Sequence, residues 1–249
     1  MEVIILKTKE QIGEAAGKII AEVVKNDPAA KLGLATGASP VPTYKYLISK
    51  YASGAISFKD VSAYNLDEYC NLPRDDENSY YTFMRKNLFD HIDIDPANTH
   101  IPDGNAADPD AECARYDALI EKIGGVDVQI LGIGTDGHIG FNEPGDSFAP
   151  GTFKIKLHES TIESNSVYFK NGDMPRYALT MGIGTIMRAK KIVLIATGKA
   201  KAGAVKAMIE GEVSPACPAS ILQTHPDVTV FLDEAAAELL TGNHAKREV

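Results

Sequence analysis

A glycine-rich stretch near the middle of the chain carries an aspartate, a histidine and a glutamate within eight residues. The three residues and the four glycines around them are Asp136, His138, Glu143, Gly132, Gly134, Gly137 and Gly140. An imidazole flanked by two carboxylates is suited to proton transfer near neutral pH, because the carboxylates orient the ring and stabilise its charged form. Glycines let the backbone approach a ligand closely. The stretch therefore predicts a catalytic loop, although its residues alone identify no substrate.

Three other interpretations apply to the same stretch. The spacing of Gly132, Gly134 and Gly137 matches a dinucleotide-binding fingerprint, but that motif needs a helix at its third glycine. Prolines and glycines follow instead, which disfavours a helix there. The acids and the histidine are also metal-ligand types, yet a zinc deaminase needs a pair of cysteines and Cys217 has no second cysteine nearby. A solvated structural turn is the third alternative.

The elements that must position this loop begin with residues 126–131, an apolar run with the length and β-branched content of a buried strand. Apolar runs at 2–6, 31–35, 61–66, 192–196 and 228–232 predict further strands. Helical patterns cover 8–26, 41–51, 78–92, 108–123 and 199–210, with a final helix through Leu240. This alternation predicts one doubly wound, Rossmann-like α/β domain over residues 1–249, with a mostly parallel sheet and helices on both faces.

The region after the central loop is less regular. We expect a strand at 154–157, a weakly helical segment at 159–169 and a turn at 171–173. Residues 181–187 are ambiguous, because Gly182 and Gly184 weaken any helix.

Polar residues follow three of the other predicted strands. Thr36, Gly37, Ala38 and Ser39 stand between a strand and a helix, where backbone amides and the helix dipole favour an anion such as a phosphate. They lack the Gly-Lys-Ser/Thr ending of a nucleotide loop, and an ordinary helix-capping turn is the alternative.

Asp67 follows residues 61–66 directly and has the placement of a general base, or of an exposed turn acid. Lys201, after residues 192–196, could reach a phosphate or simply face water. Because the carboxyl ends of parallel strands meet at one edge of a sheet, we expect all these residues to lie together.

The composition is that of an ordinary globular protein, with 44% hydrophobic and 24% charged residues. A net charge of −9 disfavours nucleic acid or an anionic membrane as partner, but not a small anionic substrate. Three isolated cysteines indicate free thiols in a reducing compartment. No segment has the length of a signal peptide or a membrane span, so we expect a cytoplasmic protein.

Several motifs resemble those of the glucosamine-6-phosphate deaminase family. They are LATGASP at 34–40, NLDEY at 65–69, LGIGTDGHIGFNEP at 131–144, YALTMG at 177–182 and ASILQTHP at 219–226. The resemblance extends over nearly the whole chain, and the central motif combined with NLDEY is highly specific. It implies conversion of glucosamine 6-phosphate and water to fructose 6-phosphate and ammonia, without a metal or organic cofactor.

The resemblance also implies roles for individual residues. Asp67 would move a proton between C2 and C1 of the substrate, and His138 would assist opening of the sugar ring. Asp136 and Glu143 would set the orientation and charge of that histidine. Thr36, Gly37, Ala38, Ser39 and Lys201 would bind the substrate phosphate and neighbouring hydroxyls. No nucleophilic serine or cysteine is required, because the ammonia is the amine already on C2.

Two departures from the family pattern carry expectations of their own. Val167 stands where relatives commonly have a phosphate-binding arginine, which predicts weaker phosphate binding, unless Lys170 or Arg176 replaces it. Phe153 and Ile155 stand where allosterically activated hexamers carry basic residues. We therefore expect a monomer or small homo-oligomer that no effector activates.

Rival functions remain from related chemistry and from other classes. The same reaction on galactosamine 6-phosphate differs only at C4 of the sugar. A 6-phosphogluconolactonase-like hydrolase would not need Asp67 to handle a C2 proton. A sugar-phosphate-sensing transcription regulator would need a basic helix-turn-helix, and we find no such segment before Glu2.

Overall fold

The computed structural model describes residues 1–166, 169, 174–242 and 245–246. Within these residues eight strands form one parallel sheet. In chain order they are β1 (Glu2–Leu6), β2 (Lys31–Leu34), β3 (Ser62–Asn65), β5 (Thr99–His100), β6 (Val128–Leu131), β9 (Ile192–Ala196), β10 (Val228–Asp233) and β11 (Ala245–Lys246). Their order across the sheet is β11-β1-β10-β9-β6-β2-β3-β5. The predicted parallel α/β architecture is confirmed.

The helices between the strands follow local sequence signals. They are α1 (Lys9–Asn26), α2 (Val41–Ala52), α3 (Tyr80–Asn87), α4 (Pro109–Lys122), α5 (Glu159–Ser166), α6 (Ile183–Ile186) and α7 (Ala202–Glu210). Helix α1 begins with the predicted capping box, in which Thr8 and Gln11 satisfy each other's backbone amides. Its buried face includes Ile12, Ala16 and Ile20, which recur at helical spacing.

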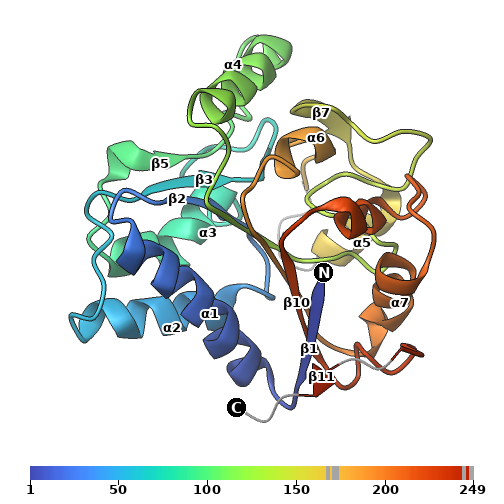
Figure 1. Ribbon diagram of the computed structural model, residues 1–249. Coiled ribbons are helices and arrows are strands. Elements are labelled where there is room, and N and C mark those ends of the chain that lie inside the picture. The colour runs from blue at the N-terminus through green and yellow to red at the C-terminus, as the bar shows by residue number, and fades with distance from the viewer. Residues whose placement is uncertain (167–168, 170–173, 243–244, 247–249) are drawn as a thin grey trace.

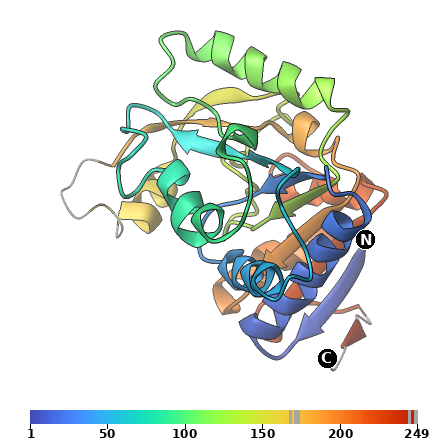
Figure 2. The same cartoon turned by 90° about the vertical axis from the view of Figure 1, so that its left-hand side faces the viewer.

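The direction of the strand connections places helices on both faces of the sheet. The chain moves outward from β1 through β2 and β3 to β5, and returns through β6, β9 and β10. Because parallel crossovers are right-handed, outward and returning connections cover opposite faces. Figure 1 shows α1 and α2 on one side of the strands, with α4 and α7 on the other. Figure 2, turned by 90°, again places α4 across the strands from α1 and α2.

The reversal of direction occurs between β2 and β6, which are neighbours in the sheet. The loops that follow these two strands lead to opposite faces, so a crevice opens at their carboxyl ends. The loops nevertheless meet, since a Cβ added at Gly132 would lie 3.8 Å from Oγ of Ser39. The topology therefore brings the predicted anion loop (residues 36–39) close to the predicted catalytic loop, which is the glycine-rich loop of residues 132–143.

A second sheet, which the sequence did not predict, completes this edge. It contains β4 (Asp67–Tyr69), β8 (Tyr177–Thr180) and β7 (Phe153–Lys156), paired antiparallel in the order β4-β8-β7. Asp67 is thus the first residue of a strand, opposite Thr180, and not part of a loop. Only β7 was expected, at 154–157. The sequences of β4 (DEY) and β8 (YALT) lack the alternation of polar and apolar residues that would identify them as strands.

Other differences from the predicted elements are local. The segment 78–92 contains α3 and a separate 3-10 turn, η1 (Phe89–His91), and 159–169 contains α5. The region 199–210 begins as the 3-10 turn η3 (Lys199–Lys201) before α7. The short elements η2 (Pro96–Asn98) and η4 (Pro218–Thr224) were not predicted.

The final helix through Leu240 is wrong: residues 234–239 form turns, anchored where the carboxylate of Asp233 accepts the amides of Gly198 and Ala236. The expected turn at 171–173 lies outside the described residues.

The strands of the large sheet are buried on both sides, and Ile130, Leu131, Val193 and Leu194 are fully enclosed. Such continuous apolar strands are typical of a parallel sheet covered by two helical layers. Among the described residues, no helix combines the length and apolar character that crossing a bilayer requires.

Candidate active site

A cavity of about 320 Å³ opens at the carboxyl ends of β2, β3 and β6. Its walls come from the anion loop, from β4, from the glycine-rich loop and from α3, α5 and η3. The lining residues are Ala35, Thr36, Gly37, Leu66, Asp67, Tyr80, Gly132, Ile133, Gly134, Thr135, His138, Gly140, Phe141, Thr161 and Lys201. The expected assembly of Asp67, His138 and Lys201 at one edge of the sheet is therefore what the structure shows.

Asp67 presents an almost buried carboxylate to this cavity, with 5% of the residue exposed. Burial, together with the neighbouring charge of Glu68, raises its pKa to about 8, against a smaller opposing effect of His138. A Cβ added at Gly140 would lie 3.5 Å from Oδ2 of Asp67, so the carboxylate faces the glycine-rich loop. This group changes protonation near neutral pH, which suits a general base.

His138 lies between two carboxylates, as its spacing suggested. Its Nδ1 is 2.8 Å from Oδ1 of Asp136 and 3.4 Å from Oε2 of Glu143. Burial disfavours the charged imidazole, but the interactions with both carboxylates outweigh burial and raise the pKa of His138 to about 9. The same contact with His138 lowers the pKa of Asp136 strongly. At neutral pH the ring is therefore a cation that can donate a proton.

The glycine-rich loop owes its shape to bonds with the second sheet. Thr180 accepts a hydrogen bond from the backbone amide of Phe141 at 3.1 Å through its hydroxyl oxygen. The side-chain amide of Asn142 donates to the carbonyls of Ile139 and Met181, both at 2.9 Å. These bonds fix the loop against the sheet that carries Asp67. The carboxylate of Asp67 and the imidazole of His138 are therefore held at a fixed separation.

Thr161, on α5, is a site residue that the sequence reasoning missed. Its hydroxyl donates to Oε1 of Glu143 at 2.6 Å, and the residue is 4% exposed. Residues 159–169 have a weak helical pattern, so nothing in the sequence singled out one threonine among their polar side chains.

Thr36 and Gly37 of the predicted anion loop line the cavity together with Lys201. The loop is held from behind by Tyr44, whose hydroxyl donates to the carbonyl of Ala35 at 2.6 Å. Gly37 has φ +88°, a conformation that favours glycine. Burial lowers the pKa of Lys201, and the charge of Asp136 partly restores it. Ala38 and Ser39 line a wider cleft of about 940 Å³, whose wall also includes Lys201.

Tyr80 and Glu68 are two further residues that sequence reasoning did not select. The carboxylate of Glu68 accepts the backbone amides of Tyr69, Tyr80 and Tyr81 at 2.8–3.0 Å, which fixes the N-terminus of α3. The hydroxyl of Tyr80 donates to that of Tyr69 at 3.2 Å and also interacts with Thr36. Glu68 thus positions the helix that supplies Tyr80 to the cavity.

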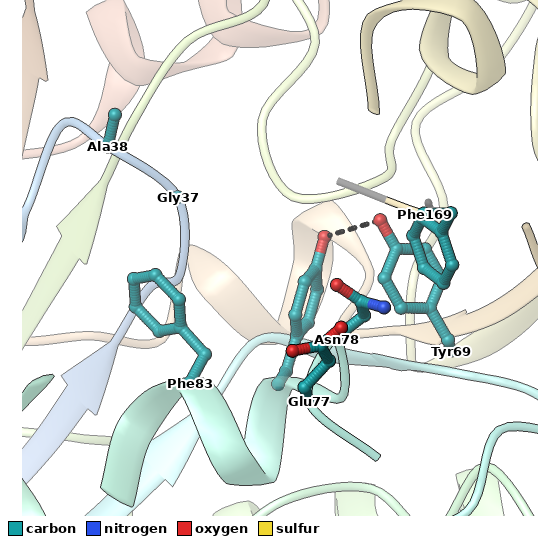
Figure 3. A pocket seen from close by; sticks show the side chains of 8 residues that line it. Gly37, Ala38, Tyr69, Glu77, Asn78, Phe83 and Phe169 are labelled. Atoms are coloured by element: carbon teal, nitrogen blue, oxygen red, sulfur yellow. Dashed lines mark hydrogen bonds between the residues drawn. The ribbon is translucent and has the colours of Figure 1, made fainter. Parts of the chain in front are cut away.

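An aromatic cavity of about 330 Å³ adjoins this site and shares Gly37 and Tyr80 with it. The dashed line in Figure 3 is the hydrogen bond between the hydroxyls of Tyr80 and Tyr69. Phe83 and Phe169 lie on either side of this pair. Glu77 and Asn78 provide polar groups at this cavity.

Asp136, His138 and Glu143 also present their ligand-type atoms within 4.8 Å of one another. Carboxylate and imidazole groups at this separation could hold a divalent cation. Both Asp136 and Glu143, however, already contact the imidazole, which accounts for the three groups as a proton-transfer set. The absence of a metal remains a prediction of the sequence.

Comparison with known proteins identifies the family. A sequence profile described as glucosamine-6-phosphate isomerases/6-phosphogluconolactonase matches residues 7–231. The chain belongs to this family. Similar relatives of this isomerase/lactonase family include a glucosamine-6-phosphate deaminase of Clostridium perfringens strain SM101, 50% identical over 96% of this chain and 100% of the relative. One from Bacillus velezensis is 50% identical over 95% and 99%, respectively.

Solved structures from the isomerase/lactonase family have the same fold. A monomeric glucosamine-6-phosphate deaminase superposes with a TM-score of 0.93 at 46% identity, over 96% of this chain and 100% of that chain. A 6-phosphogluconolactonase from Trypanosoma cruzi reaches a TM-score of 0.78 at 21% identity, over 97% of each chain. The second comparison concerns the fold alone.

The expected departure at Val167 lies outside the described residues, as does Lys170. Arg176, the other cation considered as a replacement for the family arginine, is 66% exposed at its side chain and 3.8 Å from Glu159. It does not line the cavity. Among the described lysines and arginines, Lys201 is the one that does.

Proposed function

We propose that this protein is a glucosamine-6-phosphate deaminase, which converts glucosamine 6-phosphate and water to fructose 6-phosphate and ammonia. The observation that carries the proposal is the shared cavity of Asp67, His138 and Lys201. An isomerase acting on a phosphorylated sugar needs a carboxylate base, a group that exchanges protons with the ring, and a cation for the phosphate. Relatives at about half identity carry this name.

In the first step His138 assists opening of the sugar ring. The C1–O5 bond breaks as the imidazolium gives its proton to O5 and the C1 hydroxyl gives its proton to solvent water. The pKa of about 9 keeps the ring charged at neutral pH, which makes it a proton donor. Asp136 and Glu143 hold this charge in place through Nδ1.

In the second step Asp67 removes the proton from C2 of the open-chain sugar and returns it to C1. Meanwhile the C1 carbonyl oxygen gains one proton and the C2 ammonium loses one, so the product has a hydroxyl at C1 and a protonated imine at C2. Water then hydrolyses this imine to the ketone and releases ammonia. Asp67 must be ionised to act, although burial raises its pKa to about 8. A substrate ammonium group near this carboxylate would stabilise its ionised form.

At the other end of the substrate, the phosphate binds to Lys201 and to the loop Thr36–Ser39. A lysine supplies a point charge, and the amides of a loop before a helix favour an anion. Thr36 and Lys201 line the same small cavity as Asp67 and His138, while Ala38 and Ser39 line the wider cleft that shares Lys201.

The carboxylate of Asp67 distinguishes the proposed deaminase activity from lactone hydrolysis. A lactone hydrolysis has no C2 proton to transfer, whereas here a buried carboxylate faces the cavity. Lactonase structures share the fold at 17–21% identity and carry no argument about activity.

We also propose that the protein acts in the cytoplasm as a monomer or small homo-oligomer. The free cysteines Cys70, Cys113 and Cys217 suit a reducing compartment. A structurally similar deaminase is monomeric.

The test is to measure ammonia and fructose 6-phosphate produced from glucosamine 6-phosphate, with galactosamine 6-phosphate and 6-phosphogluconolactone as parallel substrates. Equal amounts of ammonia and fructose 6-phosphate from the first substrate support the proposal. Turnover of the lactone alone contradicts it.

A further inference from the structure

We infer that Thr161 is a positioning residue, which holds the carboxylate of Glu143 in the orientation that fixes His138. The inference rests on the proposed function for its kinetic consequences and on the structure for the contact itself. It assigns α5 a part in the reaction, although that helix supplies none of the four groups expected to transfer protons or to hold the imidazole.

The contact joins the two oxygens of one carboxylate to different partners. Oε1 of Glu143 accepts the hydroxyl of Thr161 at 2.6 Å, while Oε2 lies 3.4 Å from Nδ1 of His138. Within the described residues, Oε2 and Nδ1 are both buried and lack a hydrogen-bond partner of good geometry. The bond from Thr161 therefore determines how the carboxylate is turned and which oxygen faces the imidazole.

Burial makes this bond important. Only 2% of the Glu143 side chain is exposed, so water does not readily replace a lost donor. A charge-assisted hydrogen bond is stronger than a neutral one, and a buried carboxylate without it rotates toward other donors. That rotation changes the contact between Glu143 and His138.

Four other charged or titratable groups lie around the imidazole, one on the same loop and three on other parts of the chain. Asp136 contacts the ring from the same loop, and Asp67 acts on it from β4. Lys201 on η3 and the thiol of Cys217 interact with Asp136. Within the part of the chain that the structure describes, none of these groups donates a hydrogen bond to Glu143, whereas Thr161 does, so none is placed to take over from Thr161.

Two roles for this hydroxyl can be separated by kinetics. Thr161 also lines the cavity, so a direct bond to the substrate is the rival explanation. Loss of a substrate contact raises KM, whereas loss of a positioning bond lowers kcat and leaves KM nearly unchanged.

The experiment compares Thr161→Val with Thr161→Ser. Valine has the same shape without the hydroxyl, so kcat should fall about 10- to 100-fold, as expected for one charge-assisted bond. Serine keeps the hydroxyl and should restore most of kcat. A rise in KM at constant kcat would overturn the inference, and so would an unchanged kcat in the valine variant.

Thr152→Val is the matched control for loss of a buried threonine–carboxylate bond. The Thr152 hydroxyl donates to Asp117 at 2.7 Å, away from the lining of the cavity. The Thr152→Val substitution should lower the melting temperature and preserve kcat. An equal loss of kcat in both valine variants would show a general effect of destabilisation and contradict the inference.

A double-mutant cycle with Glu143→Gln locates the effect. If Thr161 acts through Glu143, adding Thr161→Val to Glu143→Gln should change kcat less than about twofold. Losses that multiply would place the action of Thr161 elsewhere.

The last readout needs no turnover. The imidazole resonances of His138, assigned by their disappearance in His138→Gln, should shift in Thr161→Val and stay in place in Thr161→Ser and Thr152→Val. Shifted resonances in a protein that forms no ammonia would preserve the positioning role and refute the deaminase. Unshifted resonances in an active deaminase would refute the positioning role alone.

Discussion

Gly134 leaves the space that the imidazole of His138 occupies. A Cβ added at Gly134 would lie 2.2 Å from Nδ1 and 2.3 Å from Cε1 of this ring. No side chain fits at that separation, so the ring could not keep its contacts with Asp136 and Glu143 beside an alanine. The glycine thus serves the site through close approach, and not through an unusual backbone angle.

Gly134→Ala should therefore displace His138 and lower kcat by about 100-fold or more, the effect expected of roughly 1 Å of misplacement. Gly203→Ala is the control, because a Cβ there meets no atom within 4 Å. It lies in α7 and should keep full activity while gaining about 0.5–1 kcal/mol of stability from better helix propensity. Steady-state kinetics and thermal melts check both variants; normal turnover in Gly134→Ala would refute the steric argument.

Asp67→Asn should abolish isomerisation, with kcat lower by about 100-fold or more, because an amide cannot accept the C2 proton. The folding stability of this variant at alkaline pH, by contrast, should exceed that of the wild-type protein. The pKa of Asp67 rises from 3.8 to about 8 on folding, so the native state retains a proton that the unfolded chain releases between these pH values. Folding stability therefore falls as pH rises through this window.

The asparagine has no such loss, and its melting temperature at pH 9 should exceed that of the wild-type protein. Asp60→Asn, at an exposed position, should change neither quantity. An active Asp67→Asn would remove this residue from the mechanism.

The pH profile of kcat/KM should be bell-shaped, with its maximum between about pH 8 and 9. The base Asp67 must lose its proton, so activity rises through its pKa of about 8. His138 must hold its proton, so activity falls above its pKa of about 9. Because the two groups interact, the limbs report apparent values for the pair. A maximum below pH 6 would contradict these assignments.

Lys201→Met should raise KM for glucosamine 6-phosphate about 10- to 150-fold, the value of one charge-assisted bond. Its kcat should change little, because phosphate binding is the same in ground state and transition state. Lys199→Met, on the same turn, removes a lysine that is 79% exposed and 3.2 Å from Glu238. That control should have wild-type kinetics, and an equal KM in both variants would mean that Lys201 does not bind the phosphate.

Activity should survive dialysis against a strong chelator. The three ligand-type groups lie within 4.8 Å of one another, but the contacts of Asp136 and Glu143 with His138 account for them without an ion. Elemental analysis of the dialysed protein accompanies the assay. Activity that is lost on dialysis and restored by one divalent cation would identify a metal site instead.

The sequence by itself determined six of the eight described strands of the large sheet, all but β5 and β11, and the polar residues that follow three of them. Continuous apolar runs predict buried parallel strands, and polar residues directly after them predict groups at one edge. Asp67, His138 and Lys201 lie around one cavity for this reason. The capping residues Thr8 and Gln11 likewise predict where α1 begins, since the bonds involved are local.

The tertiary structure alone decided the second sheet and the contacts made across it. Strands of three or four residues, such as β4 and β8, are stabilised by their partners and leave no clear period in the sequence. The final segment through Leu240 has helical composition, yet the bonds to Asp233 hold turns there.

Thr161 and Tyr80 line the cavity from helices α5 and α3, outside the loops that the sequence identified. Their hydrogen bonds to Glu143 and Tyr69 form only when these helices pack against the site. The pKa values of Asp67 and His138 also depend on burial and on neighbouring charges, which the folded chain alone creates. Local bonding thus follows from sequence, whereas exposure, dielectric surroundings and long-range partners follow from the fold.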